Sequence, residues 1–432
     1  MAKLTYEQLQ ASFNHHMLGG EYDRVAMLRR VLDNLGHPER RFRIIHIAGT
    51  NGKGSTGRML SAILQCAGLR VGHFNSPAML DQCEQICVND QPISHQAFVD
   101  VYYQIAGALP QGLAPADLTI FEWWTLVMLQ YFATLRVDWA VIEVGLGGQN
   151  DATNCIDAPE LAVITHLALD HTRILGPTIE DIAAAKAGII KAGTRSVVLA
   201  PHQRKEAVQV VKRQAKAQGV PLIDSASHAS VIRTGQPTLA GQPLEINSDT
   251  IPPTAVTLRL LGDYQLDNLT TVLTVIDCLR RDGVKISDNV VMQALSQTTL
   301  PGRLQLVARQ PTVILDGAHN PDGARSLTDS LTHLRLTNQP LALVVGFLAD
   351  KDTATMVQEY RQLPAKVWAA TPHNHERAMS AEQLAQSWPG AQACLDGHAA
   401  LKEAIQAVGP RGVVVVTGSF YLIKEFEALY HH

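Results

Sequence analysis

A glycine-rich segment is the part of the sequence best suited to chemistry. It reads Gly49-Thr50-Asn51-Gly52-Lys53-Gly54-Ser55 and stands between an apolar run and a stretch of helical periodicity. Glycines let the backbone turn so that successive N–H groups point at an anion, and the start of the following helix adds a favourable partial charge. The spacing departs from the standard P-loop, because Ile47 occupies the place of its first glycine. We interpret the segment as a phosphate-binding loop rather than an ordinary strand–helix turn.

Two polar groups follow other predicted strands. Glu143 closes an apolar run that begins at Trp139, and Asp170-His171 come after the run Leu161–Ile164. A lone Glu at the end of a strand is more often a solvated charge. Near a phosphate loop, at the carboxyl edge of a sheet, a role in holding Mg²⁺ is about equally favoured. His171 alone is a poor indicator of Mg²⁺, which prefers oxygen, so a structural hydrogen bond is the alternative.

Lys186 lies in a small-residue stretch of a predicted helix. This local sequence favours a surface lysine whose aliphatic stem covers apolar neighbours.

Nearer the C-terminus, polar side chains gather at a second strand-to-helix turn, Asp316-Gly317-Ala318-His319-Asn320-Pro321. A Rossmann-like unit binds ligands at such a turn, but helix capping alone explains Asn320. Arg303, just past a predicted hinge, could reach a γ-phosphate. Asp350-Lys351-Asp352 fits a solvated turn equally well.

The elements that must position these groups follow an alternating pattern. Short Val- and Ile-rich runs, the first at residues 42–48, alternate with helical segments, as in a parallel sheet covered by helices. Between residues 225 and 261 the helical period fades, which predicts a small antiparallel excursion. We predict an α/β protein with an ATP-binding domain at residues 1–298 and a Rossmann-like domain at residues 299–432.

The composition excludes several classes of protein. The 432 residues include 36 Lys and Arg against 40 Asp and Glu, a net charge of −4, so no nucleic-acid partner is expected. No apolar run approaches the roughly 20 residues that span a bilayer, and the first 17 residues are too polar for a signal peptide, so no membrane partner is expected. The six scattered cysteines match no zinc spacing and indicate reduced thiols. We expect a cytoplasmic protein.

Together these motifs resemble the Mur-ligase superfamily and, within it, the folylpolyglutamate synthase/dihydrofolate synthase family. The matches occur in order along nearly the whole chain: Gly49–Ser55, Ser76-Pro77, Thr119–Glu122, Glu143–Asn154, Leu169–His171, Lys186–Ile189, Gln265 with Asn268, Pro301–Leu304, Asp316–Gly323, Asp350–Asp352 and Thr417–Ser419.

The resemblance implies a P-loop ATPase domain with a small β excursion, and a Rossmann-like C-terminal domain. It implies that Lys53 and the loop backbone hold the β- and γ-phosphates of ATP, and that Mg²⁺ occupies two sites. The residues it assigns are Ser76 and Glu143 to one Mg²⁺, His171 to the second, and Gln265, Asn268, Arg303, Asp316 and His319 to ATP. It also implies a carbamylated Lys186 in place of a surface lysine, since a carbamate is an oxygen anion that can ligate Mg²⁺.

The implied reaction is ATP-driven addition of L-glutamate to the carboxylate of a reduced folate through an acyl phosphate, by a monomer. Dihydrofolate synthase activity on dihydropteroate, alone or in addition, is the alternative. A ligase that acts on a peptidoglycan precursor is a third alternative. It is expected to have a further N-terminal domain, for which the residues before Gly49 leave no room. A P-loop switch without ligase activity leaves the Asp316–Gly323 motif unexplained. A paralogue that binds nucleotide but has lost folate activity is a further alternative.

Three positions depart from the family pattern. Asp81 and Gln85 replace arginines in the segment that the family uses for pterin or folate, and Gln149 stands where Arg is common. Glutamine supplies neither the charge nor the planar fork of Arg. The resemblance therefore supports ATP-dependent ligation more strongly than it supports folate as the substrate that accepts glutamate.

Overall fold

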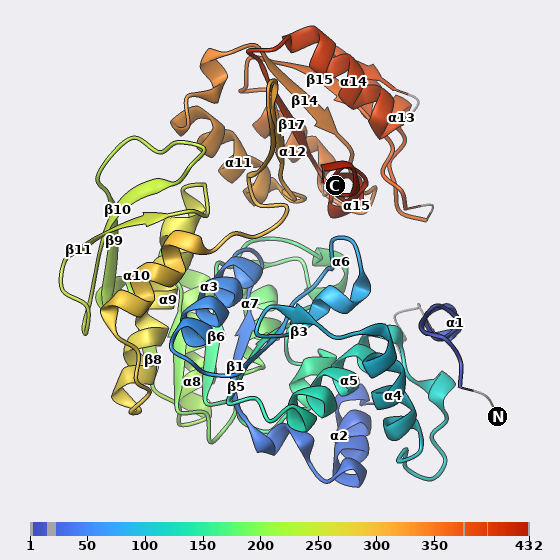
Figure 1. Ribbon diagram of the computed structural model, residues 1–432, viewed down its shortest axis with the longest axis vertical. Coiled ribbons are helices and arrows are strands. Elements are labelled where there is room, and N and C mark those ends of the chain that lie inside the picture. Colours follow the sequence, from blue (N-terminus) through green and yellow to red (C-terminus); the bar gives the residue numbers. More distant parts are fainter. Residues whose placement is uncertain (1–2, 15–22, 375, 395, 431–432) are drawn as a thin grey trace. The chain divides into compact units, whose positions relative to one another are not determined.

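The computed structural model describes residues 3–14, 23–374, 376–394 and 396–430 (Figure 1). The chain forms two compact units, one of Met1–Ser230, Asn247–Pro252 and Asn268–Ala294, the other of Val231–Ile246, Pro253–Asp267 and Leu295–His432. Each unit consists of three separate chain segments. This division does not test a single boundary between residues 298 and 299, which therefore stays a prediction. Part of the polar N-terminal stretch, residues 1–2 and 15–17, lies outside the described residues.

The first unit is built on an eight-stranded sheet in the order β4-β3-β2-β5-β1-β6-β7-β8. Its strands are β1 (Arg43–Ala48), β2 (Val71–Phe74), β3 (Ile86–Val88), β4 (Gln91–Pro92), β5 (Trp139–Glu143), β6 (Leu161–Ile164), β7 (Ser196–Leu199) and β8 (Leu222–Asp224). The six strands from β2 to β8 in this order are parallel, and β3 and β4 extend the edge antiparallel. The predicted parallel sheet is confirmed.

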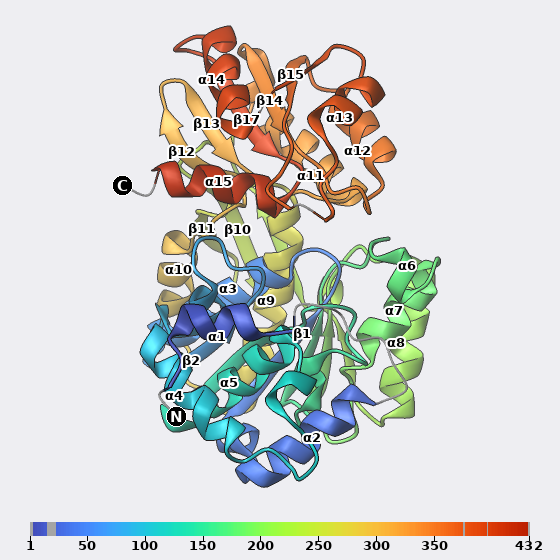
Figure 2. The ribbon, with the colours of Figure 1, turned by 90° about the vertical axis from the view of Figure 1, so that its right-hand side faces the viewer.

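Helices cover both faces of this sheet. One face packs against α1 (Tyr6–Ser12), α2 (Arg24–Leu35), α4 (His95–Ala106) and α5 (Ile120–Thr134), and further along against α7 (Ile179–Ala187) and α8 (Lys205–Ala217). Figure 2 shows α7 and α8 side by side. The opposite face carries α3 (Lys53–Cys66), whose Gly57 lies against Ile47 and Val141. The short α6 (Thr172–Leu175) precedes α7.

Two histidines are buried in the strands of this sheet. His46 in β1 contacts Thr153, with 2.9 Å between its Nε2 and the threonine Oγ1. His73 in β2 faces α3. Burial lowers the pKa of His46 to about 3 and that of His73 to about 4, so both are neutral at physiological pH.

The predicted β excursion is a three-stranded sheet of β9 (Ala229–Arg233), β10 (Gln242–Ser248) and β11 (Thr254–Leu258). Strands β10 and β11 pair antiparallel, as expected. The chain continues into α9 (Tyr264–Arg281) and α10 (Asp288–Gln297).

The second unit holds a six-stranded sheet in the order β12-β13-β17-β14-β15-β16. Its strands are β12 (Gln305–Arg309), β13 (Thr312–Leu315), β14 (Leu341–Val345), β15 (Ala365–Ala369), β16 (Ala391–Ala393) and β17 (Val413–Thr417). Only β12 is antiparallel among these described strands. One face packs against α11 (Pro321–His333), α12 (Thr353–Tyr360) and α13 (Ala381–Ser387), the other against α14 (Gly397–Val408) and α15 (Phe420–Tyr430).

Short 3₁₀ turns connect several elements, at Pro38–Arg41, Gln82–Gln85, Pro115–Asp117, Ala152–Cys155, Ser225–Ser227 and Leu336–Asn338. Within the described residues, no helix has both the length and the apolar character that crossing a membrane requires.

Candidate functional site

The glycine-rich loop joins β1 to α3, as predicted, and two of its glycines are required by close neighbours. A Cβ on Gly52 would lie 2.2 Å from Oδ1 of Asn268, and Gly52 has a φ of 90°, which L side chains rarely adopt. A Cβ on Gly49 would lie 1.8 Å from Oγ1 of Thr165. The loop backbone is therefore approached from two sides, and Asn268, which the sequence assigned to ATP, lies directly against it.

The chain after β6 holds the loop in shape. Thr50 N–H donates to the carbonyl of His166 at 2.8 Å, and its hydroxyl donates to the carbonyl of Ala168 at 2.9 Å. Thr165 donates its hydroxyl to the carbonyl of Asn51 at 2.8 Å. These contacts fix the loop conformation, and they occupy both the N–H and the hydroxyl of Thr50. Sequence reasoning missed Thr165, because a threonine after a buried strand has no distinctive spacing.

Lys53 and Glu143 come together at the edge of the sheet. Nζ of Lys53 donates to the carbonyls of Gly49 at 3.2 Å and Thr50 at 3.4 Å, and lies 3.6 Å from Oε1 of Glu143. The parallel register of β1 and β5 places Ile47 opposite Glu143, which explains the proximity. The loop thus has a cation and a buried carboxylate beside it, the pair that binding a phosphate and a divalent cation requires.

Lys186 is buried, so the interpretation as a surface lysine is wrong. Its residue is 6% exposed, and its Nζ donates to the carbonyl of Gly49 at 2.9 Å. The surface interpretation failed because helix α7 ends against the loop rather than facing water. Burial, and next the positive charge of Lys53, lower the pKa of Lys186 to about 7, against the opposing effects of Asp170, Asp151 and Glu143. A lysine with this pKa is partly a neutral amine at physiological pH, and a neutral amine is a nucleophile.

The turn after Glu143 positions Lys186. Gly148 packs on the end of α7, where a Cβ would lie 2.8 Å from the carbonyl oxygens of Ala185 and Lys186. Gln149 N–H donates to the carbonyl of Ala185 at 2.7 Å, and its side chain is exposed. Asp151 accepts from the N–H of Leu146 at 2.8 Å and fixes the turn. The small residues around Lys186 therefore serve close packing.

The other predicted metal ligands also follow the ends of strands. Ser76 comes two residues after β2, whose Phe74 pairs with Ile142 of β5, so Ser76 stands at the same sheet edge as Glu143. His171 is the N-cap residue before α6 and has a φ of 51°, and its N–H donates to Oδ1 of Asp170 at 2.8 Å. A carboxylate and a hydroxyl at one sheet edge are oxygen ligands that fit a divalent cation such as Mg²⁺.

Helix α9 carries two more of the predicted residues. Gln265 and Asn268 are both buried and stand about one turn apart.

In the second unit, the predicted residues gather around the end of β13. Both oxygens of Asp316 accept backbone N–H groups, Oδ2 from Leu304 and Oδ1 from Ala318, each at 2.9 Å. Burial raises the pKa of Asp316, and the charge of Arg303 opposes that rise. Arg303 stacks on Phe420, with Cζ 4.7 Å from the ring centre. The carboxylate therefore shapes the turn that carries Arg303.

Two neighbours of this turn have local partners as well. Nδ1 of His319 lies 2.8 Å from the carbonyl oxygen of Gly317, and Asn320 caps α11 as predicted. Farther along, Asp350 pairs with Arg377 at 2.7 Å, and Asp352 caps α12. Capping and ion pairing account for Asp350 and Asp352.

The residues that depart from the family pattern have partners within their own segment. Asp81 accepts the N–H of Cys83 at 2.8 Å and lies 2.7 Å from His95. Gln85 is buried and donates to Oε1 of Gln82 at 2.8 Å.

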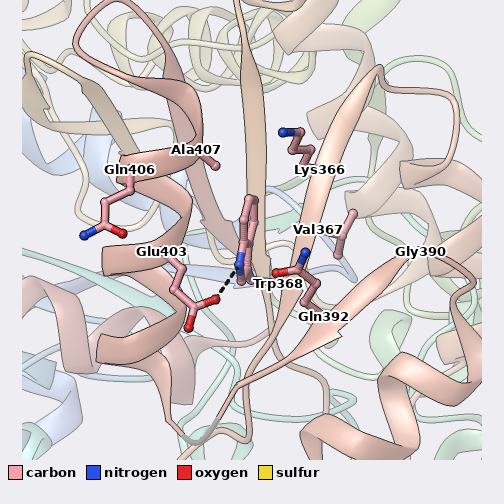
Figure 3. Close-up of a pocket in the computed structure, with 8 residues that line it drawn as sticks. All are labelled: Lys366, Val367, Trp368, Gly390, Gln392, Glu403, Gln406 and Ala407. Atoms are coloured by element: carbon pink, nitrogen blue, oxygen red, sulfur yellow. Dashed lines mark hydrogen bonds between the residues drawn. The ribbon is translucent and has the colours of Figure 1, made fainter.

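A pocket of about 560 Å³ lies elsewhere in the second unit, beside β15, β16 and α14 (Figure 3). In it, Nε1 of Trp368 donates to Glu403 at 3.1 Å. Its lining residues are Lys366, Val367, Trp368, Gly390, Gln392, Glu403, Gln406 and Ala407, and none of them is a predicted site residue.

Comparison with known proteins decides the family. Residues 47–276 match the Mur ligase middle domain, and residues 302–420 match the Mur ligase glutamate ligase domain. The chain is 33% identical over 432 residues to the dihydrofolate synthase/folylpolyglutamate synthase of Bacillus subtilis, covering 97% of this chain and 98% of that protein. The chain belongs to the folylpolyglutamate synthase/dihydrofolate synthase family. Its members are ATP-dependent ligases of the Mur ligase superfamily, as the sequence motifs predicted.

Solved structures of folylpolyglutamate synthase/dihydrofolate synthases confirm the fold. The bifunctional enzyme of Yersinia pestis, complexed with AMPPNP and Mn ion, superposes with a TM-score of 0.88 at 30% identity over 99% of this chain and 98% of that chain. E. coli FolC, in complex with DHPP and ADP, gives a TM-score of 0.85 at 27% identity over 99% of this chain and 97% of that chain. The roles of individual residues stay predictions.

Proposed function

We propose that this protein is an ATP-dependent ligase that adds L-glutamate to the carboxylate of a reduced folate. The observation that carries the proposal is the group formed by the glycine loop, Lys53, Glu143 and buried Lys186 at one sheet edge. The names of relatives support folate and glutamate as substrates, and the AMPPNP and Mn ion of the Yersinia pestis enzyme support ATP with a divalent metal.

The reaction has two covalent steps. The folate carboxylate oxygen attacks the γ-phosphorus of ATP, the bond to ADP breaks, and an acyl phosphate forms. The amine of L-glutamate then attacks the acyl carbon, giving an amide and releasing phosphate and a proton. Lys53 and the N–H groups of residues 52–55 would neutralise charge on the phosphoryl group during the first step, whereas the N–H groups of Thr50 and Asn51 donate to the carbonyl of His166.

Ser76, Glu143 and His171 would hold Mg²⁺ at two sites, and Lys186 as a carbamate would supply a further oxygen anion. Bound Mg²⁺ supplies charge neutralisation on the phosphate oxygens. The ordinary ammonium form of Lys186 could not be such a ligand, whereas its lowered pKa favours the neutral amine from which a carbamate forms.

Gln265, Asn268, Arg303, Asp316 and His319 are the further residues that we assign to ATP. In this arrangement Asp316 is a positioning residue, because both its oxygens hold backbone N–H groups.

Dihydrofolate synthase activity is the second candidate, because the Bacillus subtilis relative carries both names. The test is ADP release by the purified protein with Mg²⁺-ATP and L-glutamate, comparing tetrahydrofolate, methylene-tetrahydrofolate and dihydropteroate. Glutamate-dependent release with a tetrahydrofolate alone supports a folylpolyglutamate synthase, and added release with dihydropteroate supports a bifunctional enzyme. ATP binding without release on any acceptor would contradict both and indicate a changed acceptor.

A further inference from the structure

The loop after β2 and the start of α4 bring three potential metal ligands together. Cys83, Asp81 and His95 each offer one ligand atom, and these atoms all lie within 4.8 Å of one another. Oδ2 of Asp81 lies 2.7 Å from Nε2 of His95, while Oδ1 is used by the backbone N–H of Cys83. Thiolate, imidazole and carboxylate are a donor set that a zinc-like cation accepts.

The imidazole of His95 is oriented as a ligating histidine requires. Its second nitrogen, Nδ1, lies 3.5 Å from Oε1 of Glu7, and the ring stacks on Tyr6 with 3.9 Å between the centres and 14° between the planes. Ligating histidines almost always give their other N–H to a carboxylate, carbonyl or water, which fixes the tautomer and the ring direction. Glu7 and Tyr6 therefore leave Nε2 directed at Asp81.

A buried polar group at the same place adds an independent indication. Tyr6 is 8% exposed, and in the described part of the chain its hydroxyl makes no hydrogen bond of acceptable geometry. This hydroxyl lies beside the thiol of Cys83. A thiolate is a better acceptor than a thiol, so a metal-bound sulfur at Cys83 would accept more strongly from this hydroxyl.

Access to the cluster is open on one side. The side chains of Asp81 and His95 are each 46% exposed, whereas Cys83 is buried. A cation can therefore enter from solvent and meet the sulfur at the inner end. The thiol excludes Mg²⁺ and Ca²⁺, which prefer oxygen, and selects a softer divalent cation.

We propose that Cys83, His95 and Asp81 form a binding site for Zn²⁺ or a similar divalent transition metal, separate from the residues assigned to ATP. The ion would join α1, through Glu7 and Tyr6, to the segment where this chain departs from its family.

The test uses Co²⁺ as the probe on the full-length protein, after removal of metals with a chelator. Co²⁺ bound to a thiolate gives a charge-transfer band in the near ultraviolet, which oxygen and nitrogen ligands at the ATP site cannot produce. We expect the band with the unaltered protein, its loss in Cys83→Ser, and its retention in the matched control Cys87→Ser. Zn²⁺ should displace Co²⁺ and abolish the band.

Two further variants separate a metal site from a simple Asp–His ion pair. His95→Gln should weaken Co²⁺ binding at least as much as Glu7→Gln, which we expect to weaken it about 10- to 100-fold, as for other groups that orient a ligand. Circular dichroism checks that each variant is folded. Absence of the band in the unaltered protein, its persistence in folded Cys83→Ser, or unchanged affinity in folded His95→Gln would each overturn the proposal.

Discussion

Nζ of Lys186 lies 2.9 Å from the carbonyl oxygen of Gly49, although 137 positions separate the two residues in the chain. Lys53 donates to the same oxygen at 3.2 Å. One backbone oxygen therefore accepts from two lysines, and the charge of Lys53 lowers the pKa of Lys186. The shape of the phosphate-binding loop and the protonation of Lys186 are thus linked.

Removing either charged group at the sheet edge should abolish turnover. We expect Lys53→Ala and Glu143→Gln to lower kcat by about 100-fold or more, because charge on the phosphoryl group is then no longer balanced. Steady-state ADP release measures the loss, and circular dichroism checks folding. The exposed Lys205→Ala should keep normal turnover. Near-normal activity in either site variant would contradict the proposed phosphate and metal roles.

Carbamylation of Lys186 predicts chemical rescue. Lys186→Ala should lose about 100-fold in activity, and added acetate or formate should restore part of it, because a small carboxylate can take the place of the carbamate. Lys191→Ala is the control, since Lys191 also has a lowered pKa but donates to the carbonyls of Asn154 and Ile156. Equal rescue of both variants would speak against a specific role for Lys186.

The lowered pKa of Lys186 also predicts a dependence of stability on pH. The folded pKa is about 7 and the ordinary value is 10.5, so between these values the unfolded chain binds more protons than the folded one. The free energy of unfolding, relative to Lys186→Met, should therefore rise with pH across this window. Urea unfolding in bicarbonate-free buffer, near both ends of the window, measures it. A constant difference would show that Lys186 keeps its ordinary pKa.

Gly52→Ala should damage the loop in two ways, by backbone strain at positive φ and by a clash with Asn268. We expect a loss of about 1–3 kcal/mol in stability together with a large increase in Kd for ATP. Gly68→Ala separates the two effects, since Gly68 also has a positive φ but nothing lies within 4 Å of its added Cβ. The control should lose stability and keep ATP affinity. Equal ATP affinity in both variants would exclude the clash.

The ion pair between Arg24 and Glu122 should be important for stability. Nε of Arg24 donates to Oε1 of Glu122 at 2.8 Å, and the carboxylate is buried. Arg24→Met leaves this charge without its partner and should cost about 3 kcal/mol. The double variant Arg24→Met/Glu122→Gln should recover part of the loss. Chemical denaturation of the unaltered protein, Arg24→Met, Glu122→Gln and the double variant tests this, and additive effects would show that the pair is not coupled.

The sequence predicted those elements whose conformation depends mainly on neighbouring residues in the chain. The apolar runs gave the strands β1, β5 and β6, and Asn320-Pro321 gave the start of α11. The loop at Gly49–Ser55 was predictable because glycine spacing directly limits backbone conformation.

The remaining features depend on contacts between distant segments. Burial of Lys186 follows from the packing of Gly148 against α7, which local composition does not reveal. The nearness of Asp81 and His95, 14 residues apart, results from the hairpin of β3 and β4 that lies between them. Cysteine spacing alone therefore predicted no metal site there.

The two buried histidines in the first sheet should make the protein less stable in acid. In the folded protein the pKa of His46 is about 3 and that of His73 is about 4, whereas the ordinary pKa of histidine, expected in the unfolded chain, is 6.5. As the pH falls below 6.5, protonation therefore favours the unfolded state over the folded one. In mild acid the histidines of β1, which leads into the phosphate-binding loop, and of β2 stay neutral in the folded protein, while the free energy of unfolding decreases.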